Sequence, residues 1–371
     1  MNYCHYILLI GIFFTYSCSK PKLDNNEIIK VDLSVAKPMN MSDFVKEITL
    51  LPLETLDSCL IKRINQLEVS KNYIFINNDM SEVLVFDKNG RFITSTISKK
   101  GQGPDDYLIV ANMDITNDEL ISIFDGNTIY EYDVQMNLVD KQKIVLPEYS
   151  TIRHEMPRHL KLNEDTYIIK DGVYTYFYSV RNDSIISYKK NFYHPHSWTG
   201  VINSLRFLKH NKKIYFSPTH VSDTLYQMNI QQNQLEPIVI YDAGDWTVDL
   251  DELPQDMNIQ YYSNYLFETD KFFLSDKIHL PYADFAFLHR AKDNKSYISY
   301  KRKLHNVEIY KNGEQHFPIP HTVYKNVFVY AAMPDKLYKY IDSTLIKEKV
   351  NFANISEFDN HILVCYILNE D

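Results

Sequence analysis

The chain has 371 residues, of which 45% are hydrophobic and 14% aromatic, and its formal net charge is −9. The acidic balance and the lack of basic patches argue against a nucleic-acid partner, because binding to phosphates needs clustered Lys and Arg. Four cysteines are too few for a disulfide scaffold. The apolar content is ample for a large core, and about 350 mature residues fit either two domains or one closed all-β ring.

The N-terminus carries an export signal. An apolar run over residues 7–14 is too short to span a bilayer as a helix, and it leads to Ser17-Cys18, a small residue before a cysteine. This segment resembles a bacterial lipoprotein signal, in which the cysteine after the cut is lipidated. The alternative is a plain secretory signal with an incidental Cys18. We predict a signal peptide over 1–17, lipidation at Cys18 and a tether of linker composition over 18–43.

The rest of the chain repeats one pattern. Short β-branched and aromatic runs alternate with turn signals, and Phe86, Tyr132 and Tyr178 recur 46 residues apart at the same phase. A repeat of about 40–50 residues made only of strands is typical of a propeller blade, which must stack on copies of itself to bury both faces. The strands predicted for the first four repeats are 73–76, 82–86 and 91–94; 120–124, 128–132 and 137–144; 167–169, 174–180 and 184–188; and 213–216, 224–228 and 237–241.

Beyond residue 242 the period is looser. We expect a fifth blade from 271–274, 284–288 and 296–300, and a sixth from 326–330, 337–340 and 361–366. Residues 244–264 and 342–357 interrupt the pattern and are expected to be loops or short helices. The run 47–53 is the candidate strand to close the ring on the last blade, because an open edge invites aggregation. The prediction is all-β: a six-bladed β-propeller over 44–371, with four-stranded antiparallel blades.

Four motifs support this architecture by resemblance. They are Leu51-Pro52-Leu53-Glu54-Thr55, the segment Val85 to Phe92, Gly101-Gln102-Gly103-Pro104, and the segment Pro237 to Gly244. With them the chain resembles the six-bladed β-propeller lipoproteins of Bacteroidetes, relatives of the NHL-repeat propellers, over essentially its whole mature length. The resemblance implies a fold and a cell-envelope address but no reaction, since the family is mostly without assigned activity.

The Gly101-Gln102-Gly103 loop is the first candidate site. Two of the nine glycines lie here, next to Lys100, and glycine lets backbone amides approach a ligand closely. No strand-to-helix context follows, which argues against a nucleotide loop. The competing interpretation is a tight crossover between blades, with the glycines at positive φ.

Two tryptophans form the second candidate site. Trp198 and Trp246 are the only ones in the chain, and both fall in predicted loops. Exposed aromatic side chains can stack on sugar rings, whereas buried ones fill gaps under a loop. Both interpretations remain open for these residues.

Histidines and cysteines complete the candidates. His154 and His159 nearly match a zinc-protease helix, but their spacing is one residue too long and Pro157 breaks the helix. A metal site from His194 and His196 with a further His at the ring mouth is the weaker alternative to scattered surface histidines. We therefore predict no metal and no cofactor. Cys59 and Cys365 either pair or, as two small apolar side chains, stay free.

These observations predict a lipid-anchored binding or scaffold propeller in the cell envelope, with a glycan, peptide or envelope protein as partner. The alternative is a lyase or hydrolase of glycans or peptides acting at the ring mouth. Residues Lys20 and Lys22 occupy the stretch where surface-exported lipoproteins of this group carry acidic residues. We therefore expect an outer-membrane protein that faces the periplasm, with the cell surface as the alternative.

Overall fold

The computed structural model describes much of the chain after residue 43 and one short N-terminal strand. The described residues are 27–30, 42, 44–146, 158–170, 174–190, 207–210, 213–216, 224–242, 264–268, 272–279, 283–290, 295–303, 320–347 and 355–369. The predictions for Cys18, Trp198 and Trp246, and those for His154, His194 and His196, fall outside these ranges. Within them, no helix has the length and apolarity that a membrane crossing requires.

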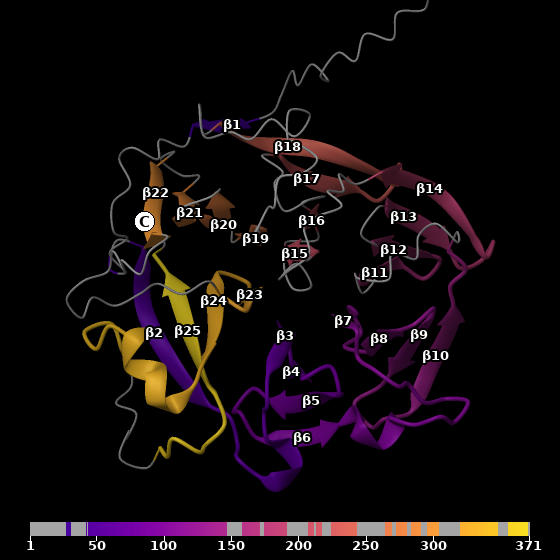
Figure 1. Ribbon diagram of the computed structural model, residues 1–371, viewed down its shortest axis with the longest axis horizontal. Helices are drawn as coiled ribbons and strands as arrows, with labels where there is room; N and C mark the ends of the chain where they lie inside the picture. Colours follow the sequence, from indigo (N-terminus) through magenta and orange to yellow (C-terminus); the bar gives the residue numbers. More distant parts are fainter. Residues whose placement is uncertain are drawn as a thin grey trace, which may run out of the picture.

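The described strands form six sheets arranged about a common centre (Figure 1). Five sheets have four strands, each strand antiparallel to its neighbours. They are β3 (Ile64–Val69), β4 (Tyr73–Asn78), β5 (Glu82–Asp87) and β6 (Phe92–Ser95); β7 (Asn112–Ile115), β8 (Ile121–Asp125), β9 (Thr128–Tyr132) and β10 (Leu138–Lys143); β11 (Arg158–Asn163), β12 (Thr166–Lys170), β13 (Tyr174–Ser179) and β14 (Ser184–Lys190); β19 (Asn264–Glu268), β20 (Phe272–His279), β21 (Ala283–Arg290) and β22 (Lys295–Lys303); and β23 (Thr322–Tyr324), β24 (Val327–Ala332), β25 (Ile362–Leu368) and β2 (Val45–Pro52).

The remaining sheet departs from the predicted six uniform blades. Strands β15 (Leu208–His210), β16 (Lys213–Phe216), β17 (Thr224–Asn229) and β18 (Gln234–Asp242) are antiparallel, but β1 (Glu27–Lys30) adds a fifth strand in parallel to β18. Five sheets therefore have the expected four-stranded form and one does not. The physical reason is that residues 27–30, which precede β2, pair with the outer edge of that sheet.

The sheets meet through their first strands. β3 contacts β7, β7 contacts β11, β15 contacts β19, and β23 contacts both β19 and β3. In Figure 1 these short strands face the centre, while β6, β10, β14, β18 and β22 lie toward the outside. This radial arrangement of four-stranded antiparallel sheets is a β-propeller.

The N-terminal strand takes the predicted place. β2 pairs with β25 along its length, from Val45 opposite Leu368 to Pro52 opposite Ile362. Phe44 and Ile48 are fully buried in the core that this pairing creates. The sheet that ends the chain thus takes its fourth strand from the beginning of the described fold.

Apolar side chains on both faces of each strand bind neighbouring sheets together. In β4, Phe75 packs into a core with β7, β8 and β9, whereas Ile74 and Ile76 pack on the opposite face against β24 and β25. Phe86, Tyr132 and Tyr178, the residues of the 46-residue period, are all completely buried in the third strand of their sheets. The prediction that each repeat is covered on both faces is confirmed for these sheets.

Two sequence-based expectations need correction. The predicted strand 337–340 is instead part of the 3-10 helix η8 (Pro334–Lys339), because Pro334 lacks an N–H for a ladder and its fixed φ suits a helical start. The first strand of every sheet was missed, since these strands have only three or four residues, as β7, β15 and β23 do, or include polar residues, as β3, β11 and β19 do. Of the two alternatives left open for Cys59 and Cys365, the structure shows free thiols, and Cys59 donates to the Glu54 carbonyl at 3.2 Å.

Removing β2 should destabilise the fold severely. A chain that starts at Glu54 loses Phe44, Ile48 and Leu50 from the core and leaves the edge of β25 open, so we expect aggregation or a loss of roughly 5 kcal/mol or more. The matched control starts at Ser42, which keeps β2 but lacks the residues before it, β1 included. Thermal unfolding and size-exclusion chromatography measure the effect. Equal stability of the two truncated chains would show that β2 is dispensable.

Candidate functional site

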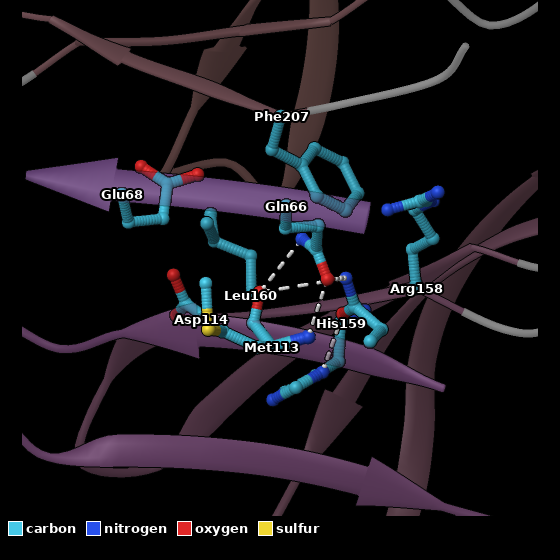
Figure 2. Close-up of a pocket in the computed structure, with 9 residues that line it drawn as sticks. Gln66, Glu68, Met113, Asp114, Arg158, His159, Leu160 and Phe207 are labelled. Atoms are coloured by element: carbon cyan, nitrogen blue, oxygen red, sulfur yellow. Dashed lines mark hydrogen bonds between the residues drawn. The ribbon is translucent and has the colours of Figure 1, made fainter. Parts of the chain in front are cut away.

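A small polar pocket opens where the first strands of four sheets meet. Its lining comes from β3, β7, β11 and the residue before β15, and consists of Gln66, Glu68, Asn112, Met113, Asp114, Arg158, His159, Leu160 and Phe207 (Figure 2). The cavity measures about 30 Å³. That is room for about two water molecules or for the tip of a larger ligand.

One wall of the pocket is a side chain that pairs with a neighbouring backbone. The amide of Gln66 donates from Nε2 to the Met113 carbonyl at 3.0 Å and accepts the Met113 N–H at Oε1 at 2.8 Å. Strand β7 ends its sheet, so the outward N–H and C=O of Met113 would otherwise lack ladder partners. The Gln66 side chain therefore makes the two backbone hydrogen bonds that a neighbouring strand would make, and so joins the first sheet to the second.

A side-chain oxygen accepts a backbone N–H in the same way between the second and third sheets. Asn112 Oδ1 accepts the backbone N–H of His159 at 2.8 Å, and Asp114 Oδ2 accepts the backbone N–H of Lys161 at 3.2 Å. In each pair the partners lie 47 residues apart, as do Gln66 and Met113. The repeat length thus places a polar side chain of one first strand opposite the free edge of the next.

His159 is held as a neutral ring inside this network. Its Nδ1 donates to Asn112 Oδ1 at 2.7 Å, and its Nε2 lies 2.8 Å from the Ser122 hydroxyl. Asn112 Oδ1 can only accept, so Nδ1 carries the proton and Nε2 accepts from Ser122. Burial lowers the pKa of His159 from its ordinary 6.5 to about 4, against the opposing charge of Asp114. At neutral pH the imidazole is a structural hydrogen-bonding group.

Two buried carboxylates of the second sheet are neutralised by lysines from other sheets. Asp114 Oδ1 lies 2.5 Å from Lys209 Nζ, which reaches across from β15 and also donates to the Ile115 carbonyl at 3.0 Å. Glu131, buried between the second and third sheets, accepts from Lys161 Nζ at 2.8 Å. The first pair joins sheets that are distant in sequence, and the second joins the consecutive second and third sheets.

The remaining charged groups of the pocket lie at its two ends. Figure 2 shows Glu68 and Asp114 toward one end and Arg158 toward the other, with Phe207 above the middle. Glu68 accepts a hydrogen bond from Thr322 at 3.3 Å, so β23 also reaches this region. The ring of Phe207 stacks on Phe216 with 5.1 Å between centroids, which fixes its position. The arrangement presents opposite charges on either side of an aromatic ring.

The Gly101-Gln102-Gly103 loop lies elsewhere, in the crossover between the first two sheets. Its ends close on each other, because Gly101 N–H donates to the Tyr107 carbonyl and Tyr107 N–H to the Lys99 carbonyl, each at 3.0 Å. Lys100 Nζ donates to Ser81 Oγ at 2.8 Å. Lys100 and residues 101–103 do not line the pocket. The backbone bonds show a tight connection between two sheets, as the crossover interpretation describes.

The expected positive φ of these glycines was wrong. Among the described glycines only Gly90 and Gly126 have positive φ. Space is the actual constraint: a Cβ on Gly101 or Gly103 would lie 2.5 or 2.7 Å from Asp106 Oδ2. That oxygen accepts the Gly103 N–H at 3.0 Å, so the carboxylate is held where a side chain would have to fit.

Sequence reasoning missed the pocket residues and singled out the crossover loop instead. Gln66, Asn112, Asp114 and Arg158 lie on strands that have no clear apolar alternation. The sequence does carry one signal for these residues. Each polar side chain that bonds the next sheet lies 47 residues before its backbone partner, close to the blade repeat. Within the described residues, no group of three or more His, Cys, Asp or Glu side chains is placed to hold a metal ion.

The stability of the protein should fall in acid because of His159. The unfolded chain binds a proton on this residue below pH 6.5, whereas the folded ring stays neutral until about pH 4. Stability is therefore complete above pH 6.5 and is lost as the pH falls toward 4, by up to about 3 kcal/mol. Denaturant unfolding at pH 7 and pH 4.5 measures this loss. His159→Gln, which cannot titrate, should be less sensitive to pH, and equal pH dependence of the two proteins would refute the assignment.

The crossover loop offers a double-mutant test. Gly103→Ala should cost about 1 kcal/mol, because its Cβ displaces the Asp106 carboxylate from the Gly103 N–H. With Asp106→Ala present, the same change should be neutral or slightly stabilising, since the backbone there suits alanine. Lys100→Ala and Gln102→Ala serve as surface controls of nearly unchanged stability. An equal cost of Gly103→Ala in both backgrounds would contradict this account.

Comparison with known proteins places the chain by family and by fold. A predicted exported protein of Bacteroides fragilis NCTC 9343 superposes with a TM-score of 0.69 at 18% identity, covering 92% of this chain and all of the other. A member of the DUF4221 family from Bacteroides vulgatus ATCC 8482 reaches 0.49 at 9% identity, over 87% of this chain and 98% of its own. The first likeness shows a shared fold.

No curated protein matches the sequence. A family model does: that of a domain of unknown function, DUF4934, matches residues 26–366. This range includes β1, every residue of the pocket and all six sheets apart from the last two residues of β25. The chain therefore belongs to the DUF4934 family.

Proposed function

We propose that this protein is a binding or scaffold module of the cell envelope that contacts its ligand at the central pocket. The observation that carries the proposal is the convergence on one polar hollow of side chains from three sheets and of Phe207, which precedes a fourth. Propellers commonly bind where several blades meet near the axis. Glu68, Arg158 and Phe207 supply opposite charges and an aromatic face for the tip of a glycan or peptide.

A binding role fits this pocket better than hydrolysis. A general acid or base needs a side chain free to exchange protons with a substrate. His159 is instead held between Asn112 and Ser122, and Asp114 is paired with Lys209. These groups are committed to holding the sheets together, which favours recognition over proton transfer.

The envelope location rests on two supports. The first is the apolar run that ends at Ser17-Cys18, which fits lipidation of Cys18. The second is the structural likeness to a predicted exported protein of Bacteroides fragilis. We propose attachment to the outer membrane through lipid on Cys18, on the periplasmic side because Lys20 and Lys22 follow the cysteine.

We further propose that the six sheets are the blades of one closed, NHL-like ring. The pairing of β2 with β25 supports this, since it joins the start of the fold to its end. Contacts of β23 with both β3 and β19 support it as well. Closure of this kind leaves no sheet face without a neighbour.

The binding proposal is tested with glycan and peptide arrays on the purified mature protein. We expect saturable binding without turnover, and weaker binding for Glu68→Gln at an unchanged melting temperature. Gln102→Ala, an exposed change in the crossover loop, is the matched control and should bind normally. Product formation would favour the lyase or hydrolase, and loss of binding in Gln102→Ala alone would move the site to the crossover loop.

A further inference from the structure

One strand of the structure belongs to no blade. β1 pairs in parallel with β18, with Glu27 opposite Val239 and Lys30 opposite Asp242. Every other ladder between the described strands is antiparallel. β1 is therefore an added segment that covers the outer edge of one sheet by strand addition.

The position of β1 limits how far the fold can lie from the start of the mature chain. Nine residue steps separate Cys18 from Glu27, which span at most roughly 30 Å when fully extended. If β1 were undocked, the first fixed strand would be β2, 27 steps from Cys18 at Val45. The same estimate then allows roughly 90 Å. Docking of β1 shortens the reach about threefold.

The outer edge of β18 also lies on one side of the ring. Figure 1 shows β1 and β18 on the opposite side of the centre from β5 and β6. A short connection from Cys18 to the edge at β18 keeps that edge closer to the anchor than the edge at β6. A long flexible connection would leave both edges equivalent.

We infer that β1 is an orienting clamp, which holds the sheet of β15–β18 toward the membrane so that the ring stands with this edge nearest the lipid. The inference rests on the proposed lipidation of Cys18. The docking surface is the outer edge of β18, and the segment that docks on it is β1 of the same chain. Backbone hydrogen bonds supply the contact, so tether length and strand geometry set the orientation.

Energy transfer to a labelled membrane tests the clamp. Lipidated protein is bound to vesicles that carry an acceptor on the headgroups, with a donor on either Gln232→Cys or Asn89→Cys. Both positions are exposed in the turn between the third and fourth strands of a sheet, and the sheets lie on opposite sides of the ring. Cys59 is buried, and the parent protein labelled in parallel corrects for Cys365. We expect higher transfer from position 232 than from position 89.

The control variants separate the clamp from the anchor. Ile28→Pro with Ile29→Pro removes two adjacent N–H groups, one of which must face β18, so the contrast between the two labels should be lost while vesicle binding persists. Ile28→Val with Ile29→Val keeps both N–H groups and should preserve the contrast. Equal transfer in the parent, or a contrast that survives the proline pair, would overturn the clamp. Persistent vesicle binding of Cys18→Ser would instead overturn anchoring at Cys18, and the reach argument with it.

Discussion

Hydrogen bonds from side chains of one first strand to the backbone of the next hold the centre of this propeller together. A first strand is paired on one side only, so its other side presents N–H and C=O groups that need partners. Gln66 satisfies Met113 with two bonds, and Asn112 and Asp114 satisfy His159 and Lys161. Amide and carboxylate side chains thus take the place of ladder bonds between sheets, which explains why buried polar residues lie on the first strands.

Because of this constraint, the polar residues near the centre fall into two groups, those that hold the sheets together and those proposed to contact a ligand. Asn112, Ser122 and His159 form a closed chain of bonds, and Asp114 is neutralised by Lys209. Groups so engaged cannot be removed without leaving buried polar atoms unpaired, which is costly in a low dielectric. Glu68 and Phe207 also line the pocket and take no part in this chain of bonds, which makes them the candidates for recognition in the proposed function.

At the rim of the ring, segments are joined by bonds between backbone groups. Crossovers such as Gly101 to Tyr107 close on themselves through backbone bonds, with Asp106 filling the space that glycine leaves open. The outer edge of β18 is covered by β1, a segment from before β2, rather than by a blade strand. The centre thus fixes the relative position of the sheets, while the rim offers edges to which other segments can add.

The sequence by itself determined the all-β class, the blade-sized repeat and the pairing of the N-terminal strand with the last sheet, because Phe86, Tyr132 and Tyr178 and the runs around them are apolar on both faces. It did not reveal the first strands, whose polar side chains, Gln66 and Asn112 among them, give no apolar alternation. Those side chains find their partners 47 residues away, at a neighbouring sheet, so their role exists only once the sheets are stacked. The pocket, the neutral state of His159 and the docking of β1 were accordingly decided by tertiary structure, since each depends on contacts between segments that no local pattern connects.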